Sequence, residues 1–359
     1  MSRPNQARLD LDALRHNVAV ARALAPQSSM MAVVKANAYG HGAVTIARAL
    51  ESQVDALAVA CLEEAVELRS AGVSAPVLLL EGVFERSELL TATELGLWLT
   101  IENEQQLDWL ESTALPAPVH CWLKVDTGMN RLGIRPAQAP ACFKRLQAQD
   151  KVAGEIVVYT HFACADKLQS EKTPQQLAAF ESLPIDALRS AANSAGLLAW
   201  PASHYNWVRP GYMLYGNSPL LNEHHNAASL QPVMTLASAI ISLREVDAGD
   251  AVGYGGTWIA QRPSRIATVT IGYGDGYPRQ APNGTPVLVN GQRAALAGCV
   301  SMDMITVDVT DLEDVQLGDE VILWGKGLPL SEVAQCAATI GYELTTRMPA
   351  RTPRVVIAG

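Results

Sequence analysis

The stretch Ala32–Gly42, with the sequence AVVKANAYGHG, is the part of the chain that decides how the rest is interpreted. The apolar and partly β-branched run Met30–Val34 leads into it and is typical of a buried strand. A single lysine, Lys35, ends this run. Because burial lowers the pKa of an amine and keeps it nucleophilic, a lysine at the tip of a buried strand is well placed to form a Schiff base. Its position alone is equally compatible with a lysine that only extends its amine into solvent.

Length and composition indicate a globular protein with two domains. The chain has 359 residues, of which 49% are hydrophobic, and its mean hydropathy is +0.10. A typical α/β barrel takes roughly 250 residues, which leaves on the order of a hundred for a second domain. A net charge of −9 argues against a nucleic-acid partner, because few cations are available to meet phosphates.

Several compositional features point to a cytoplasmic protein that carries no metal. The first twelve residues contain no apolar core of a secretory signal, and no apolar run reaches the roughly 18 residues that a membrane span requires. The six cysteines are dispersed without a CxxC pair, which favours reduced thiols over disulfides or a zinc site. No HxH or HExxH spacing occurs, so no metal site is predicted.

Over residues 1–230, short apolar runs alternate with helix-like segments. This rhythm predicts an N-terminal parallel (β/α)8 barrel, preceded by a short N-terminal segment. A doubly wound sheet is the alternative, although no GxGxxG motif follows the first strand. The predicted helices include Leu11–Leu24, Ala43–Leu50 and Leu62–Ser70. The predicted strands are Met30–Val34, Ala56–Ala60, Val77–Leu80, Leu97–Leu99, Val119–Val125, Ile156–Tyr159, Leu188–Ala191 and Trp207–Val208.

Near Gln231 the pattern changes to strand-like runs separated by Gly, Pro, Asn and Asp. Only one later segment, Ser331–Ile340, has the length and pattern of a helix. Residues 231–359 are therefore predicted to form a mainly antiparallel β domain.

Polar side chains follow most of the predicted barrel strands at the point where each strand ends. Barrel enzymes place their chemistry at this rim. The side chains found there include a lysine, two arginines, a histidine and a serine, and a random scatter would not gather them on one rim. In chain order they are Lys35, Arg131, His161, Ser194 and Arg209.

Taken together, these motifs resemble those of the alanine racemases, which are pyridoxal 5'-phosphate enzymes of fold-type III with an α/β barrel and a β-rich second domain. The resemblance runs along nearly the whole chain. Besides AVVKANAYGHG, it rests on four further segments: LKVDTGMNRLG at 123–133, AVGYGGTW at 251–258, IGYGDGYPR at 271–279 and GCVSMDM at 298–304. It implies interconversion of L- and D-alanine by a homodimer in which each β domain completes the other chain's site.

The resemblance also implies which residues bind the cofactor. Lys35 would bind it covalently, and Arg209 would face its pyridine nitrogen. His161 would lie between Arg209 and the second catalytic base. The cofactor phosphate would be held by Tyr39, Ser194, Gly211, Tyr212 and Tyr342. At Tyr212 the family usually has a small aliphatic residue, so this chain departs from the pattern there, although a backbone N–H contact can survive the change.

The remaining implied roles concern the substrate. Racemisation requires bases on opposite faces of Cα, and Tyr254 matches the family's second base, opposite Lys35. Arg131 and the backbone of Met302 would hold the substrate carboxylate. Lys124 matches a lysine that is carbamylated in some relatives, and whether it is modified here stays open. Three further residues would line the entryway to the site: Asp166, Tyr273 and Arg279.

Three alternative functions remain beside alanine racemisation. They are a racemase of broader amino-acid specificity, a fold-type III decarboxylase and a non-catalytic protein that binds pyridoxal phosphate in a single barrel. The second domain and its tyrosine segment argue against the last two. Whether D-alanine is made for the cell wall or consumed in catabolism cannot be decided from the sequence.

Overall fold

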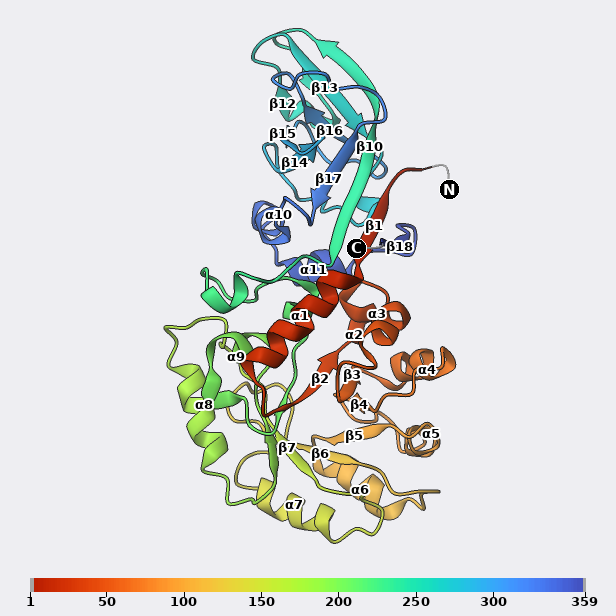
Figure 1. Cartoon of the computed structure of the whole chain (residues 1–359), viewed down its shortest axis with the longest axis vertical. Helices are drawn as coiled ribbons and strands as arrows, with labels where there is room; N and C mark the ends of the chain where they lie inside the picture. The colour runs from red at the N-terminus through yellow and green to blue at the C-terminus, as the bar shows by residue number, and fades with distance from the viewer. Residues whose placement is uncertain (1–2, 358–359) are drawn as a thin grey trace. The chain divides into compact units, whose positions relative to one another are not determined.

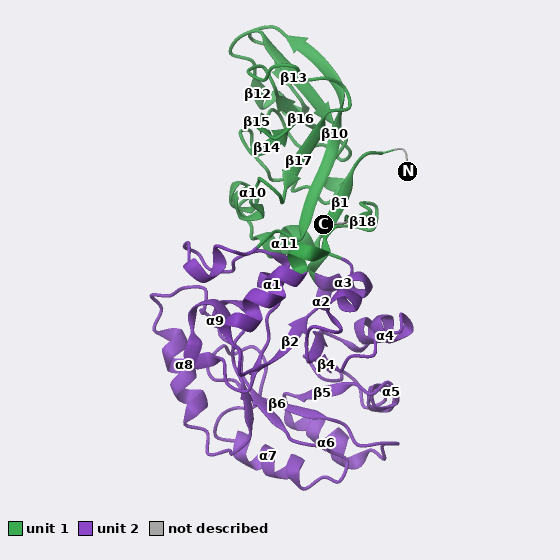
Figure 2. Cartoon of the chain, viewed as in Figure 1, with its two compact units in different colours: residues 1–14, 39–41, 231–359 green, residues 15–38, 42–230 purple. Residues whose placement is uncertain are grey.

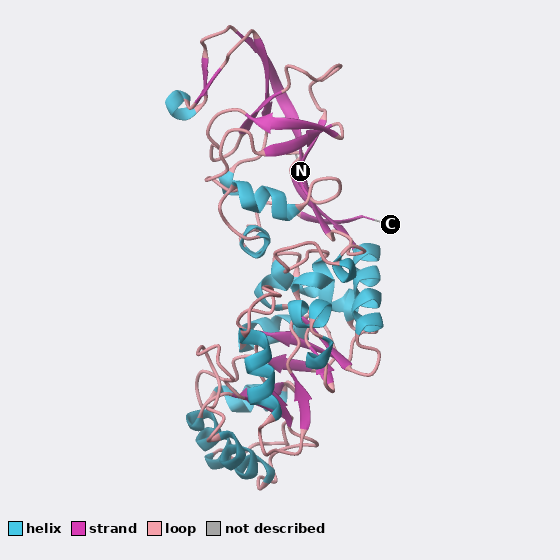
Figure 3. Ribbon diagram, turned by 90° about the vertical axis from the view of Figure 1, so that its left-hand side faces the viewer, coloured by secondary structure: helices cyan, strands magenta, loops and turns pink. Residues whose placement is uncertain are grey.

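The computed structural model of the chain describes residues 3–357. It divides into two compact units, coloured separately in Figure 2. Unit 2 covers residues 15–38 and 42–230, and unit 1 takes residues 1–14, 39–41 and 231–359. Helices predominate in unit 2 and strands in unit 1, as Figure 3 shows.

Unit 2 contains a closed parallel barrel, which confirms the predicted fold (Figure 1). Each strand pairs in parallel with the next, and the last strand closes on the first, with Ser29 opposite Trp207. Short strands such as Val77–Leu79 are buried at every position, as expected for a sheet that is covered on both faces. The strands are β2 Ser29–Val33, β3 Ala56–Val59, β4 Val77–Leu79, β5 Trp98–Ile101, β6 Cys121–Lys124, β7 Val157–Tyr159, β8 Leu188–Ser190 and β9 Trp207–Val208.

Helices connect the barrel strands, and several of their bounds match the sequence prediction. Helix α3, Ala43–Leu50, buries Ile46, Ala47 and Leu50 on one face. The predicted Leu11–Leu24 and Leu62–Ser70 are α1 and α4, whereas α5 had no predicted counterpart. The others are α5 Glu88–Glu94, α6 Glu104–Ser112, α7 Ala139–Gln147, α8 Lys172–Glu181 and α9 Ser194–Ala199.

Unit 1 is built on one sheet with the strand order β13-β16-β15-β14-β17-β10-β1-β18. Its neighbouring strands run antiparallel except for the parallel pair of β1 and β18, so the sheet is mainly antiparallel as predicted. The strands are β1 Gln6–Asp10, β10 Met234–Val246, β13 Ser264–Val269, β14 Pro286–Val289, β15 Gln292–Leu296, β16 Ile305–Asp308, β17 Glu320–Trp324 and β18 Arg354–Ile357. Two short helices, α10 Leu330–Cys336 and α11 Gly341–Thr346, lie between β17 and β18 in the chain.

Two short segments group with unit 1, although the sequence predicts a barrel domain over 1–230. The N-terminal strand β1 does so because it pairs with β10 on one side and with β18 on the other. Residues 39–41 do so because Arg354 donates a hydrogen bond to the carbonyl oxygen of Gly40, at 3.0 Å. A Cβ atom on Gly40 would lie 1.8 Å from the carbonyl oxygen of Thr345, so only glycine fits there.

Over residues 3–357, no helix is both long enough and apolar enough to cross a membrane. All six cysteines lie in this range, and each of them is a free thiol.

Candidate active site

Lys35 follows the end of β2 and begins a left-handed turn. Residues 36–39 all have φ between 52° and 55°, a conformation that non-glycine residues rarely adopt in succession. Side chains hold the turn from both ends. The Glu64 carboxylate accepts hydrogen bonds from the Ala36 N–H at 2.6 Å and the Ala60 N–H at 2.8 Å. Asn37 accepts one from the Ala43 N–H at 2.7 Å. Backbone strain of this kind is concentrated at functional sites.

The environment of Lys35 disfavours the charged form of its amine. Burial lowers the pKa of Lys35, and the positive charge of Arg131 lowers it further. The carboxylates of Glu81 and Glu64 oppose these two effects on the pKa without cancelling them. A lowered pKa makes the neutral form of the amine, which acts as a nucleophile or a base, easier to reach.

Arg209 is 4% exposed and is fixed by backbone and hydroxyl groups of the barrel. Its guanidinium donates hydrogen bonds to Ser190 Oγ at 2.5 Å and to the carbonyl oxygen of Thr160 at 2.6 Å. Burial lowers the pKa of Arg209 to about 10, so the side chain stays cationic at neutral pH. Its Nε–H donates to no residue within 3–357, so this donor is available to a ligand.

Tyr159 is a site residue that the sequence reasoning missed, because it was counted only as the last apolar position of a strand. Its buried ring lies 4.9 Å from the Arg209 guanidinium carbon and 5.6 Å from Lys124 Nζ. Its hydroxyl is hydrogen-bonded to Thr100 Oγ1 at 2.9 Å and donates to the carbonyl oxygen of Leu80 at 3.1 Å. The electron-rich face of the ring therefore stabilises two buried cations.

Lys124 and Arg131 add positive charge to the same rim. Lys124 is 7% exposed, and burial, together with Arg131 and Arg209, lowers its pKa to about 8. The loop that presents Arg131 is organised by one carboxylate oxygen of Asp126. It accepts hydrogen bonds from the N–H groups of Gly128, Met129 and Asn130 at 2.9 to 3.1 Å. Arg131 itself is exposed, so its planar pair of donors is open to a carboxylate ligand.

His161 follows β7 and is neutral at pH 7. Burial and the positive charge of Arg209 and Arg131 hold the pKa of His161 well below its usual range. Its Nε2 lies 3.5 Å from the side-chain nitrogen of Asn193. Asp166, further along the same loop, is half-buried, and its carbonyl oxygen accepts a hydrogen bond from the Leu221 N–H.

Ser194 and the segment after β9 form a cradle of hydrogen-bonding groups. The Ser194 hydroxyl, 5% exposed, accepts from the N–H groups of Gly211 at 3.0 Å and Met213 at 3.2 Å. Tyr212 lies between these two donors and is buried. Burial raises the pKa of Tyr212, so its phenol stays neutral. Because the Ser194 oxygen accepts both of these hydrogen bonds, its own O–H remains to be donated to a phosphate. The open donor of Arg209 fits an unprotonated ring nitrogen, so this unit suits pyridoxal 5'-phosphate.

Tyr254, Tyr273 and Met302 belong to unit 1, and their side chains are 70%, 42% and 53% exposed. Tyr254 lies in a 3-10 turn, Tyr254–Gly256, between β11 (Ala251–Val252) and β12 (Trp258–Ile259). Backbone hydrogen bonds join the segments of Tyr273 and Met302, since the Tyr273 N–H donates to the Ser301 carbonyl oxygen at 3.0 Å. Large apolar side chains exposed together are typical of an interaction surface.

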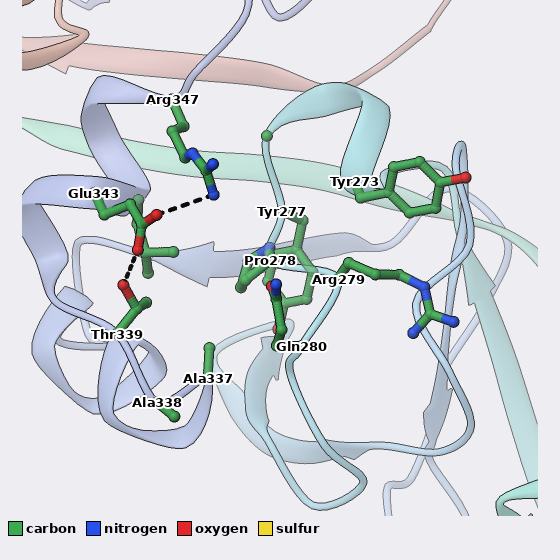
Figure 4. A pocket seen from close by; sticks show the side chains of 12 residues that line it. Tyr273, Tyr277, Pro278, Arg279, Gln280, Ala337, Ala338, Thr339, Glu343 and Arg347 are labelled. Atoms are coloured by element: carbon green, nitrogen blue, oxygen red, sulfur yellow. Dashed lines mark hydrogen bonds and ion pairs between the residues drawn. The ribbon is translucent and has the colours of Figure 1, made fainter.

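Tyr273 and Arg279 line a cavity of about 540 Å³ in unit 1 (Figure 4). Glu343 lies across the cavity, paired with Arg347 at 3.0 Å and hydrogen-bonded to Thr339. Tyr39 and Tyr342 also belong to this unit, with ring centroids 6.0 Å apart, and burial raises the pKa of Tyr39 to about 12.

Each unit thus gathers part of the predicted site. Five groups of unit 2 interact electrostatically: Lys35, Lys124, Arg131, His161 and Arg209. The other predicted residues of that unit are Ser194, Gly211, Tyr212 and Asp166, and unit 1 carries Tyr39, Tyr254, Tyr273, Arg279, Met302 and Tyr342.

A closed parallel barrel with a lysine, two arginines and a histidine following its strands, joined to a mainly antiparallel β domain, is typical of a class of barrel enzymes. The comparisons with known proteins specify the family. Residues 9–219 match the family described as alanine racemase, N-terminal domain, and residues 233–356 match alanine racemase, C-terminal domain. The chain belongs to the alanine racemase family.

Individual relatives match nearly the whole chain. The biosynthetic alanine racemase of Pseudomonas aeruginosa is 51% identical over 354 residues, which cover 98% of this chain and 99% of that protein. The catabolic alanine racemase of Pseudomonas putida is also 51% identical, over 98% of both chains. A crystal structure of biosynthetic alanine racemase from P. aeruginosa superposes with a TM-score of 0.95 at 51% identity, covering 99% of this chain and 100% of that one.

Proposed function

We propose that this racemase interconverts L- and D-alanine with Lys35 and Tyr254 as bases on opposite faces of Cα. The observation that carries the proposal is the lowered pKa of Lys35 at a rim that also presents Arg131, Arg209 and a neutral His161. A single base cannot both remove a proton from one face and return it to the other, so the phenol of Tyr254 supplies the second.

Pyridoxal 5'-phosphate is the cofactor that these residues would hold. When bound, it delocalises the electron pair that remains at Cα after the proton leaves. Lys35 would bind its aldehyde carbon covalently, and Ser194, Gly211 and Tyr212 would bind its phosphate together with the hydroxyls of Tyr39 and Tyr342. Arg209 would donate its Nε–H to the ring nitrogen and keep that nitrogen unprotonated. Such a contact would limit electron withdrawal by the cofactor and would favour rapid return of a proton to Cα.

Arg131 and the N–H of Met302 would hold the substrate carboxylate, and His161 would share the proton of Tyr254.

We further propose a homodimer in which Tyr254 and Met302 complete the site of the partner copy. The high exposure of both side chains supports this arrangement. Asp166, Tyr273 and Arg279 would line the path by which alanine enters. The six unpaired thiols support a cytoplasmic location.

The physiological direction does not follow from the chemistry. Enantiomers have equal free energies, so the enzyme runs equally in either direction, and relatives of both the biosynthetic and the catabolic kind are equally similar. Substrate range is tested by incubating the purified enzyme with single L-amino acids. D-product from alanine alone, or from alanine far above the others, supports the proposal over a broad-range racemase.

The role of Lys35 is tested with Lys35→Ala, and Lys144→Ala is the control because Lys144 lies on α7 away from the rim. We expect Lys35→Ala to lose racemisation and the visible absorbance of the lysine-bound cofactor, while the control keeps both. Turnover by Lys35→Ala without an added amine would contradict the assignment.

Tyr254→Phe separates the two bases. In D2O, we expect the variant still to exchange the Cα proton of the enantiomer that Lys35 serves, while its racemisation falls about 100-fold or more. The value of kcat/KM must fall equally in both directions, since the equilibrium constant is unity. Equal and small losses of exchange for both enantiomers would count against Tyr254.

A further inference from the structure

A buried carboxylate, Asp275, closes the turn that carries Tyr273. Its side chain is fully buried and receives donors from two distant parts of the chain and from its own turn. The two terminal nitrogens of Arg3 each donate to one carboxylate oxygen at 2.9 Å. Arg351 Nε lies 2.8 Å from Oδ1, and the Gly272 N–H donates to Oδ2 at 3.0 Å. Burying a carboxylate is costly unless it is paired and hydrogen-bonded in this way.

The same guanidinium groups also reach the neighbouring segment that contains Met302. Arg351 pairs with the carboxylate of Asp303, and Arg3 donates to the carbonyl oxygen of Asp303 at 3.1 Å. Two arginines and two carboxylates therefore form a network with no net charge. Asn5 adds a hydrogen bond to Asp275 at 3.2 Å. The network joins the segments 272–276 and 301–304 to the N-terminal residues.

The turn at residues 272–276 fixes the orientation of the peptide group between Ser301 and Met302. The Tyr273 N–H donates to the Ser301 carbonyl oxygen at 3.0 Å, and the Gly274 N–H donates to the Met302 carbonyl oxygen at 2.9 Å. In a trans peptide the N–H points opposite to the carbonyl. The Met302 N–H is therefore directed away from the turn, and it donates to no residue among those described.

The fit between the two segments leaves no room for adjustment. A Cβ atom on Gly272 would lie 2.2 Å from the Ser301 carbonyl oxygen and 2.5 Å from that of Met302. The position of the turn and the direction of the Met302 N–H are therefore coupled, and Asp275 holds the turn.

We infer that Asp275 is a positioning residue for substrate binding. With Arg3 and Arg351 it orients the Met302 N–H toward the substrate carboxylate. This inference rests on the proposed function, in which that N–H is a carboxylate ligand. It assigns a role in substrate binding to the N-terminal residues Arg3 and Asn5, far in sequence from the motifs of the site.

The test uses Asp275→Asn in the holoenzyme, which keeps the shape of the side chain and leaves two guanidinium groups facing one carboxylate. We expect KM to rise about tenfold for both enantiomers with kcat within about twofold, because the contact is made in the ground state and the transition state alike. Calorimetric titration with propionate, which carries the carboxylate of alanine without its amine, is expected to show the same rise in Kd.

Arg3→Ala is the second variant, because Arg3 is partly exposed and its loss leaves Arg351 in place. We expect a smaller rise in KM and in the propionate Kd. Glu332→Gln is the matched control, since it breaks a two-bonded ion pair with Arg293 in the same unit. Its KM and propionate Kd are expected to be unchanged.

If both network variants lower only the melting temperature and leave KM and the propionate Kd unchanged, the inference is overturned. Should Asp275→Asn fail to fold, Arg3→Ala decides by the same criterion. Absence of alanine racemisation in the unmutated enzyme would instead overturn the proposed function, so the two failures are distinguishable.

Discussion

At the scale of single residues, Tyr159 explains how the barrel holds Lys124 and Arg209 close together. No carboxylate forms an ion pair with either cation among residues 3–357, and the tyrosine ring faces both. A desolvated cation–π contact is worth about 2 kcal/mol. The ring therefore stabilises the two cations in place of a carboxylate. A carboxylate would do the same but would also bind protons.

Two substitutions separate the ring of Tyr159 from its hydroxyl. Tyr159→Phe keeps the ring but leaves the Leu80 carbonyl oxygen without its donor, so we expect a loss of about 1–2 kcal/mol in stability and near-normal kcat/KM. Tyr159→Leu removes the ring, and we expect kcat/KM to fall at least about tenfold, since roughly 2 kcal/mol of cation–π stabilisation is lost. Denaturant unfolding and steady-state kinetics measure these effects, with Tyr205→Phe as a control. Equal kinetics for the two Tyr159 variants would contradict a role for the ring.

Lys124 provides a pH-dependent prediction. With a pKa of about 8, much of its amine is neutral at pH 8, and the neutral amine is the form that adds carbon dioxide. The nearby cations Arg131 and Arg209 would stabilise the carbamate anion. In 13C-bicarbonate we expect a carbamate resonance that is absent from Lys124→Ala. As the pH falls below about 8 the amine protonates, so the signal and the bicarbonate-dependent activity should both decline. A spectrum without that resonance at pH 8 would contradict the modification.

At the scale of elements, the left-handed turn after Lys35 tests whether its strain is needed. Ala36 is exposed and has a φ of 52°, where glycine is favoured and β-branched residues are penalised. We expect Ala36→Gly to change stability by less than about 0.5 kcal/mol and Ala36→Val to cost about 1–2 kcal/mol. Thermal unfolding measures both. Equal stability of the two variants would contradict the left-handed assignment.

The left-handed conformation of this turn could not be predicted from the sequence. The strands and most helices were predicted because their apolar periodicity is local, and the site residues at the rim followed from their positions after strands. Nothing in Ala36–Tyr39 indicates positive φ, because alanine and tyrosine prefer other conformations. Helix α10 ends at Cys336, short of the predicted Ile340, because Ala338 has a φ of 52°. Both Tyr159 and Asp275 depend on partners distant in sequence, which no local pattern reveals.

At the scale of the whole molecule, the proposed sharing of sites between copies is testable by mixing two inactive variants. Lys35→Ala and Tyr254→Phe, refolded together, form some mixed dimers. If Tyr254 acts in the partner's site, one site of each mixed dimer is intact and the other carries both changes, so activity is regained. If both residues act within one chain, every site carries one change. Mixtures as inactive as the separate variants would contradict a shared site.

The place of β1 in the sheet has a consequence for biosynthesis. β1 precedes the barrel in the chain but lies between β10 and β18 in its sheet, so both of its partners are translated only after the entire barrel. During that interval its edges are open to pairing with other nascent chains. We therefore expect the barrel to fold first. Chaperones that act during synthesis should bind mainly at β1, whose partner strands have not yet been made.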